Sequence, residues 1–249
     1  MRSLLAPEYR AITSHLAITP PVSVVIPAMN EARNLPHVFK TLPDWIHEVV
    51  LVDGNSTDDT VRVALELRPD VKVVKQAGKG KGDALISGFA ACTGDIIVMV
   101  DADGSADGQE IVSYVSALVG GADFAKGSRF ANGGGTDDMT LIRRLGNRVL
   151  CALVNRRFGA RYTDLCYGYN AFWRHCLDHI VLDCTGFEIE TLINIRVVKA
   201  GLRVQEVPSH EYLRIHGVSN LHAVRDGLRV LRVILRERGQ RRERRGAPS

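Results

Sequence analysis

Four apolar runs in the first half of the chain alternate with helical patterns. The apolar runs cover residues 22–26, 48–52, 71–75 and 96–100. Continuous runs of this length indicate strands that are covered on both faces. The helical patterns that follow them cover about residues 31–40, 58–67, 83–91 and 109–119. This alternation predicts an α/β fold with a parallel sheet and right-handed crossovers.

The second half has the same kinds of element in a less regular order. We predict a strand, a flexible glycine-rich loop, a long helix, an extended segment, a further helix and a last strand, at residues 122–126, 132–135, 139–158, 163–172, 187–200 and 202–207. The Pro20-Pro21 pair ends an N-terminal segment that looks loosely attached. We therefore expect an arm at residues 1–21, a single domain at 22–238 and a basic tail at 239–249.

Composition narrows the class of protein. The 249 residues are 45% hydrophobic and 24% charged, which fits a globular protein with a sizeable core. Much of the net charge of +4 lies after residue 225, so the body is nearly neutral, and this argues against a general nucleic-acid binder. No apolar run approaches the roughly 18 residues of a membrane span. The five cysteines form no CxxC pair, which favours reduced thiols in a cytoplasmic protein.

Residues 95–105, with the sequence DIIVMVDADGS, carry the clearest candidate chemistry. The apolar run delivers Asp101 and Asp103 to the carboxyl edge of the predicted sheet, where α/β proteins bind ligands. Mg²⁺ or Mn²⁺ uses few protein carboxylates and completes its shell with water and phosphate oxygens. The alternative is that the acids only shape a turn, as we expect of Asp107 and Glu110 in a capping box. We favour a metal site that bridges to a phosphate.

The loops after the other predicted strands carry further polar groups. These loops are residues 27–31 (PAMNE), 53–56 (DGNS) and 78–82 (GKGKG). The carboxyl ends of parallel strands meet at one edge of a sheet, so the loops converge with the two acids. A nucleotide diphosphate needs polar hydrogen bonds at one end and charge neutralisation at the other. The convergent set of loops suits such a ligand.

With these motifs the chain resembles the family 2 glycosyltransferases of the GT-A fold, especially the polyprenyl-phosphate (dolichyl-phosphate) mannose and glucose synthases. The matching segments, in the family's order, are VVIPAMNE (24–31), VDGNSTDDT (52–60), GKGDAL (80–85), VDAD (100–103), GSRF (127–130), TDLCYGYNAF (163–172), FEIE (187–190) and EVPSHEYLRIHGVSN (206–220). The resemblance implies a mostly parallel central sheet flanked by helices. It also implies a nucleotide-sugar-binding half at residues 22–120 and an acceptor-binding half at 121–238.

The resemblance implies roles for the donor-site residues. Those that would hold the base and ribose are Pro27, Ala28, Glu31 and Asp53. Lys81 would approach the pyrophosphate, Asp101 would contact the ribose or the metal, and Asp103 would be the principal metal ligand. Local alternatives are a strand stop at Pro27, a helix N-terminal acid at Glu31 and a solvated turn around Lys81.

Three positions depart from the family pattern. Gly54 stands where a second acid often follows, Ser105 stands where glutamine or histidine often lies near the metal, and Asn220 stands where lysine is common. The departures imply altered base recognition, a metal site that depends more on water, and one positive charge fewer at the leaving group.

The acceptor side depends on basic residues and one acid. Arg129, and Arg143 or Arg144, match positions that such synthases use for the acceptor phosphate, which guanidinium binds bidentately; surface charge is the alternative. Asp164 matches an acid near the donor sugar, which would be a general base toward a hydroxyl acceptor but is not needed for a phosphate. Arg214 matches the R-x-x-G-x-S segment that would close over the diphosphate. Glu188 and Glu190 could serve in the site instead, but their spacing on a helix prevents both from facing it.

The C-terminal helical pattern is amphipathic and basic. Its apolar stripe comprises Leu221, Val224, Leu228, Leu231 and Leu235, and the neighbouring basic stripe comprises Arg225, Arg229, Arg232 and Arg236. Such a helix can lie on an anionic membrane, where each basic group contributes about 1 kcal/mol. The alternative is that the stripe packs on the body. The pattern allows a protein that is peripheral on the inner face of the membrane.

The sequence therefore predicts a metal-dependent inverting glycosyltransferase with a GDP-mannose or UDP-glucose type of donor. A polyprenyl phosphate is the acceptor that the arginines and the basic helix favour. A soluble hydroxyl acceptor, such as a sugar or metabolite, is the alternative that the three departures favour. The third interpretation is a non-catalytic sugar-nucleotide-binding protein. No pattern in the sequence predicts the oligomeric state.

Overall fold

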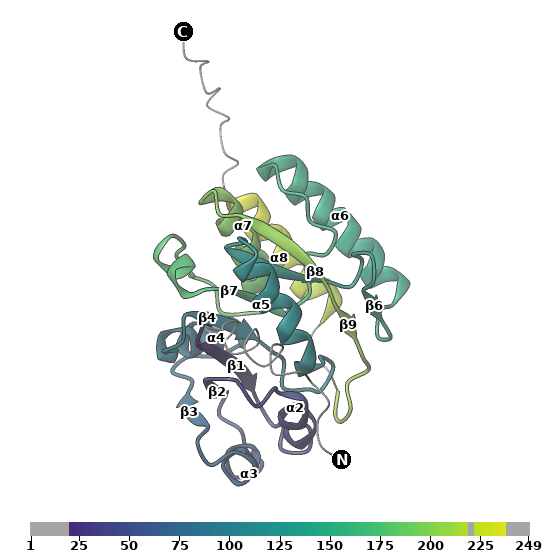
Figure 1. The fold of residues 1–249 in the computed structure, drawn as a ribbon. Coiled ribbons are helices and arrows are strands. Elements are labelled where there is room, and N and C mark those ends of the chain that lie inside the picture. Colours follow the sequence, from purple (N-terminus) through teal and green to yellow (C-terminus); the bar gives the residue numbers. More distant parts are fainter. Residues whose placement is uncertain (1–19, 219–221, 238–249) are drawn as a thin grey trace, which may run out of the picture.

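The computed structural model describes residues 20–218 and 222–237. Residues 1–19 of the predicted arm, the tail at 239–249, and Ser219, Asn220 and Leu221 lie outside the described residues. Figure 1 shows one central sheet with helices on both faces. The sheet confirms the predicted α/β class with mostly parallel strands.

Seven strands form the central sheet in the order β3-β2-β1-β4-β7-β5-β8. Their bounds are β1 Val22–Ala28, β2 Glu48–Asp53, β3 Lys72–Lys75, β4 Ile96–Met99, β5 Phe124–Ser128, β7 Asn170–Trp173 and β8 Val204–Pro208. β7 runs antiparallel to both β4 and β5, whereas the other neighbouring pairs are parallel. The reversed strand joins the regular first half to the second half of the chain.

The helices that cover the sheet are α2 Leu35–Thr41, α3 Thr60–Leu67, α4 Lys81–Ala91, α5 Ile111–Val119, α6 Leu141–Phe158, α7 Ile189–Lys199 and α8 Ala223–Arg236. Two short 3₁₀ turns, Gly108–Glu110 and Arg174–Asp178, complete the helical elements of the described chain. The first helix begins four residues later than predicted, at Leu35. This start leaves Pro36 in the first turn, where its missing N–H costs no hydrogen bond.

The core consists of two apolar clusters, one on each face of the sheet. Along β1, Val24 belongs to the cluster beneath α2, α3 and α5, while Val25 belongs to the cluster beneath α4, α6, α7 and α8. Successive residues of a strand point to opposite faces, so a run that is apolar throughout fills both clusters. This explains why the apolar runs of the first half were reliable predictors of strands.

Two expectations for the second half were wrong in part. The glycine-rich loop ends in a strand, because β6 Gly135–Thr136 pairs with β9 His210–Glu211. Helix α8 packs on the body through Val230, Val233 and Ile234, which are buried, whereas Leu228 and Leu235 of the predicted stripe are exposed. The helix is apolar on two faces, and periodicity alone does not say which of them meets the core. None of the described helices is long and apolar enough to span a membrane.

Candidate active site

A cavity of about 520 Å³ opens at the carboxyl ends of β1 and β4. The predicted site residues that line it are Pro27, Ala28, Glu31, Lys81, Asp101, Asp103 and Arg214. Asp53, Arg129 and Asp164 are not part of this lining. Converging loops at the carboxyl edge of a parallel sheet thus bring together residues that lie far apart in the sequence.

Lys81 forms the first charged cluster of the cavity. Its Nζ lies 2.6 Å from Asp101 Oδ1 and 2.6 Å from Glu190 Oε1. Burial opposes the charge on the amine, but the two carboxylates raise the pKa of Lys81 above its ordinary value. The lysine is therefore a permanent cation, held beside one of the two aspartates. Glu190 lines the cavity and Glu188 does not.

Arg214 forms the second charged cluster. Its Nη1 lies 3.3 Å from Asp103 Oδ2, and its Nη2 pairs with the carboxylate of Glu31. Burial raises the pKa of Glu31, although hydrogen bonds from Asn34 and Arg214 act against this shift. Each aspartate thus has its own basic partner, and that of Asp103 comes from a segment 111 residues further along the chain.

Ser105 supports Asp103 directly. The Ser105 hydroxyl donates to Asp103 Oδ1 at 2.7 Å, and the Ser105 backbone N–H donates to the same oxygen at 3.0 Å. The second carboxylate oxygen of Asp103 faces Arg214. In this structure Ser105 orients the carboxylate through a tight turn.

Gly54 is explained by its surroundings. A Cβ at this position would lie 3.2 Å from Ala28 O, from Gln76 Oε1 and from Met29 Cβ. Gln76 is buried, lines the cavity and donates from Nε2 to Gly80 O at 2.8 Å. A side chain after Asp53 would therefore require these neighbours to shift by a few tenths of an ångström. Asp53 itself accepts from the backbone N–H of Ser56 at 3.1 Å, so it shapes the turn beside the cavity.

The glycine-rich loop is packed where it enters α4. A Cβ at Gly82 would lie 2.4 Å from Cys184 O, and a Cβ at Gly80, whose φ is +89°, would lie 2.3 Å from Thr185 O. Only glycine allows this close approach of two backbones. The loop is exposed at residues 77–80, but the contact anchors Lys81 at the cavity, so a purely solvated turn does not describe it.

The acids fit a divalent metal that has few protein ligands. Asp101 and Asp103 both line the cavity, and their side chains are 37% and 22% exposed. Within residues 20–218 and 222–237, no group of three or more histidine, cysteine, aspartate or glutamate side chains is arranged to hold a metal. Mg²⁺ or Mn²⁺ at Asp101 and Asp103 would therefore take most of its ligands from water and phosphate.

Arg129 and Asp164 form a buried ion pair outside the cavity. Arg129 Nε and Nη2 donate to the two oxygens of Asp164 at 2.6 and 2.9 Å, and Nη1 donates to Glu211 at 2.9 Å. Burial alone raises the pKa of Asp164, but the hydrogen bonds and charge of Arg129 hold this pKa below the ordinary value. With its oxygens engaged and no exposed surface, Asp164 is not placed to take a proton from a substrate in this structure.

The far side of the cavity is basic. Arg143 lines it and pairs with Asp138 at 3.0 Å, whereas Arg144 is exposed and lies outside the lining. Arg225 and Arg229 of α8 also line the cavity, which the sequence did not predict. Their signal was visible as the basic stripe of the last helix, but a membrane contact was the interpretation given to it. The tertiary structure turns part of that stripe toward the cavity.

Gly168 lies so close to the Lys81 cluster that the position has no room for a side chain. A Cβ at this position would lie 2.7 Å from Glu190 Oε1, 2.8 Å from Lys81 Nζ and 3.0 Å from Asp101 Oδ2. We expect Gly168→Ala to force these groups apart and to lower kcat/KM for the donor by about tenfold to a hundredfold, because small displacements of positioning groups are costly. Steady-state kinetics and donor-induced thermal shifts measure the effect.

Gly146→Ala is the matched control for this substitution, since no atom lies within 4 Å of a Cβ at Gly146. The control should behave like the unmodified protein in both assays. An equal donor response from Gly168→Ala would mean that the Lys81 cluster does not contact the donor.

The sheet and the aspartate pair after β4 define the class of protein, which is a GT-A glycosyltransferase. The structure is similar to that of glucosyl-3-phosphoglycerate synthase from Mycobacterium tuberculosis in complex with Mn²⁺, uridine-diphosphate and glucosyl-3-phosphoglycerate. The TM-score is 0.69, the sequence identity is 23%, and the similarity covers 95% of this chain and 85% of that chain. At this identity the similarity is evidence for the fold.

The chain belongs to glycosyl transferase family 2, whose sequence model matches residues 23–181. It is 32% identical to Glycosyltransferase AglJ of Haloferax volcanii, over 83% of this chain and 68% of that protein. It is 31% identical to Dolichol-phosphate mannosyltransferase of Pyrococcus furiosus, over 80% of this chain and 59% of that protein. It is 32% identical to Polyprenol monophosphomannose synthase of Mycolicibacterium smegmatis, over 80% of each chain. The predicted family is thereby confirmed.

Proposed function

We propose that the protein is an inverting glycosyltransferase that moves a hexose from a nucleotide diphosphate sugar to a polyprenyl phosphate at a membrane surface. The observation that carries this proposal is the cavity in which Asp101 and Asp103 each have a basic partner, Lys81 and Arg214. Such a set neutralises a diphosphate leaving group together with a divalent metal. The donor is of the GDP-mannose or UDP-glucose type.

The basic side chains of the cavity act on the leaving group. Lys81 and Arg214 exchange their carboxylate partners for diphosphate oxygens when the donor binds, so the positive charge is already in position when the sugar departs. Pro27, Ala28 and the turn at Asp53 hold the nucleotide end. The metal on Asp101 and Asp103 supplies Lewis-acid stabilisation of the diphosphate when it is bound.

A phosphate acceptor agrees with the state of Asp164. Asp164 is engaged in the ion pair with Arg129, and Arg129 in turn donates to Glu211, which lines the cavity. Asp164 is therefore a positioning residue that acts on the cavity wall through Arg129. A phosphate is already ionised and needs no general base. Arg143, Arg225 and Arg229 supply the cationic surface that such an acceptor requires. Two relatives, named above, are a dolichol-phosphate mannosyltransferase and a polyprenol monophosphomannose synthase, and their names support a lipid phosphate.

A soluble acceptor is the second candidate. The same arginines would suit a small phosphate-bearing molecule, and the structurally similar glucosyl-3-phosphoglycerate synthase is named for a soluble one. Incubation of the protein with labelled donor and a membrane extract separates the candidates. We expect labelled product in the organic phase. Product that stays wholly in water would overturn the lipid acceptor and favour the soluble one.

Donor identity is accessible from a thermal-shift screen of nucleotide sugars with and without Mn²⁺. A ligand that binds only the native state raises the melting temperature with its concentration. We expect the correct donor and Mn²⁺ together to raise the melting temperature more than either does alone. Without donor, Lys81 and Arg214 compete with the metal for the aspartates, whereas the diphosphate of a bound donor takes over these two basic partners and leaves the aspartates to the metal. Tight binding of a donor that is never turned over, even by slow hydrolysis, would instead identify a non-catalytic sugar-nucleotide-binding protein.

A further inference from the structure

Helix α6 exposes an apolar face that nothing in the described chain covers. Leu141, Ile142, Leu145 and Val149 are 81%, 79%, 65% and 59% exposed. Their spacing puts them on one side of the helix. The opposite side packs on the body through Asn147, Cys151, Val154 and Phe158, so α6 is firmly seated and its outer face is a stable surface. Concentrated exposed apolar groups of this kind mark an interaction site.

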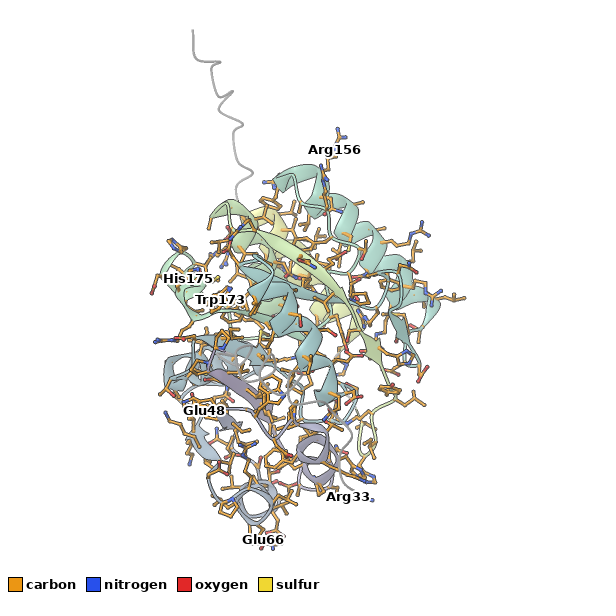
Figure 2. The ribbon with its side chains drawn as sticks, in the orientation of Figure 1. Arg33, Glu48, Glu66, Arg156, Trp173 and His175 are labelled. Atoms are coloured by element: carbon orange, nitrogen blue, oxygen red, sulfur yellow. The ribbon has the colours of Figure 1, made fainter. Side chains whose placement is uncertain are left out.

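The same helix is basic and has no acidic residue. Its sequence, LIRRLGNRVLCALVNRRF, carries five arginines and no aspartate or glutamate. Arg144, Arg148 and Arg156 are exposed and form no ion pair with the residues that the structure describes. Figure 2 shows Arg156 projecting away from the body at the end of α6. The apolar face is therefore flanked by arginines that have no described carboxylate partner.

We infer that the outer face of α6 docks on an anionic lipid surface, with Leu141, Ile142, Leu145 and Val149 inserted at the level of the headgroups. The positive charge of α6 favours an anionic lipid surface as the partner of this face. Apolar side chains beside arginines are typical of helices that lie in a membrane interface. A second copy of the chain, packed by a twofold axis on the same face, would bring arginines against arginines without an acid on either helix to pair with them.

The location of this face agrees with a lipid acceptor. Arg143 belongs to the same helical turn as Ile142, and Arg143 lines the cavity. A membrane that meets the first turns of α6 would therefore lie next to the basic side of the cavity, where a lipid phosphate would enter. This step rests on the proposed function, whereas the docking face itself does not depend on it. The surface differs from the C-terminal helix, on which the sequence had suggested a membrane contact.

Vesicle sedimentation of the full-length chain tests the inference without donor or acceptor. The probes are vesicles of mixed phosphatidylcholine and phosphatidylglycerol, against vesicles of phosphatidylcholine alone. We expect binding to the anionic vesicles, weakening with salt. The double variant Ile142→Glu/Leu145→Glu should bind at least about tenfold more weakly, because two inserted apolar side chains become negative charges that the anionic lipid repels. The double variant Val112→Glu/Val119→Glu, which makes the same change at exposed positions of α5, is the control and should bind normally.

The double variant Arg144→Gln/Arg148→Gln measures the contribution of positive charge to vesicle binding separately from that of the inserted apolar side chains. Each basic group near an anionic surface contributes about a factor of five in affinity, so we expect a loss of roughly twentyfold to thirtyfold. Undiminished vesicle binding by the α6 glutamate variant would overturn the inference and assign the binding to another part of the chain. A dimer in size-exclusion chromatography that this variant dissociates, without any vesicle binding, would overturn it in favour of a second copy. Donor-induced thermal shifts of the same variants report on the proposed function separately.

Discussion

Asp103→Asn should lower kcat for sugar transfer by about a hundredfold or more, because it removes a charge that, in the proposed mechanism, would hold the metal beside the leaving group. The substitution keeps the size of the side chain and its hydrogen bonds from Ser105. It also removes the ionic partner of Arg214, which then pairs with Glu31 alone. Steady-state assays of donor consumption, with Mn²⁺ varied over a wide range, measure the loss. We expect more Mn²⁺ to recover only part of the activity.

Asp107→Asn is the matched control for Asp103→Asn. Asp107 lies four residues later, outside the cavity lining, and its carboxylate accepts from the backbone N–H of Gln109 at 2.9 Å. The kcat of the Asp107→Asn variant should stay within about twofold of that of the unmodified protein, since a helix cap contributes to stability and not to catalysis. If Asp103→Asn keeps full activity and an unchanged Mn²⁺ response, Asp103 is not a metal ligand and the proposed mechanism fails.

Asp164→Ala should cost about 3–5 kcal/mol of the free energy of unfolding, because it removes the bidentate carboxylate partner of the buried Arg129 guanidinium and leaves it the single contact with Glu211. Both members of this pair are nearly inaccessible, with side chains 2% and 0% exposed. Urea unfolding monitored by circular dichroism gives the value. The matched control is Asp59→Ala, which breaks the exposed ion pair with Arg62 and should change stability by about 1 kcal/mol or less.

The pH dependence of Asp164→Ala has a definite sign. Arg129 holds the folded-state pKa of Asp164 below the ordinary value of 3.8, so the ion pair stabilises the folded protein above that pH. The contribution is lost as the pH falls through the lower, folded-state pKa. The stability difference between the unmodified protein and Asp164→Ala should therefore be constant at neutral pH and shrink in acid. A variant of unchanged stability that lacks activity would return Asp164 to the role of general base.

Local patterns were sufficient to bring most of the predicted donor-site residues to one edge of the sheet. The apolar runs before Pro27, Asp53 and Asp101 become adjacent parallel strands, and parallel strands deliver their following loops to one edge. The glycines of the basic loop were also a local signal, although a GKGKG run before a helix is equally compatible with a solvated turn. Pro27, Glu31, Lys81 and the aspartate pair consequently lie on one cavity as expected.

The sequence did not predict which residues, distant along the chain, would form ion pairs with each other. Lys81 finds Glu190 over a sequence separation of 109 residues, and Arg214 finds Glu31 over 183 residues. The sequence contains many acids and arginines that could have met instead, and the pairing depends on how whole elements pack. Cavity residues such as Gln76 and Gly168 have no motif that marks them, because their importance lies in what they touch.

The sequence by itself determined the α/β class, the family and the edge of the sheet at which a nucleotide sugar would bind, because all three follow from local periodicity and short motifs. Only the tertiary structure decided that Arg129 and Asp164 neutralise each other in the interior, since burial depends on the whole surrounding shell. It also decided which face of each amphipathic helix is covered. In α8, Leu228 and Leu235 of the predicted stripe are exposed, and in α6 an apolar face beside the cavity is left uncovered by the described residues. Periodicity identifies a face, but only packing shows what meets it.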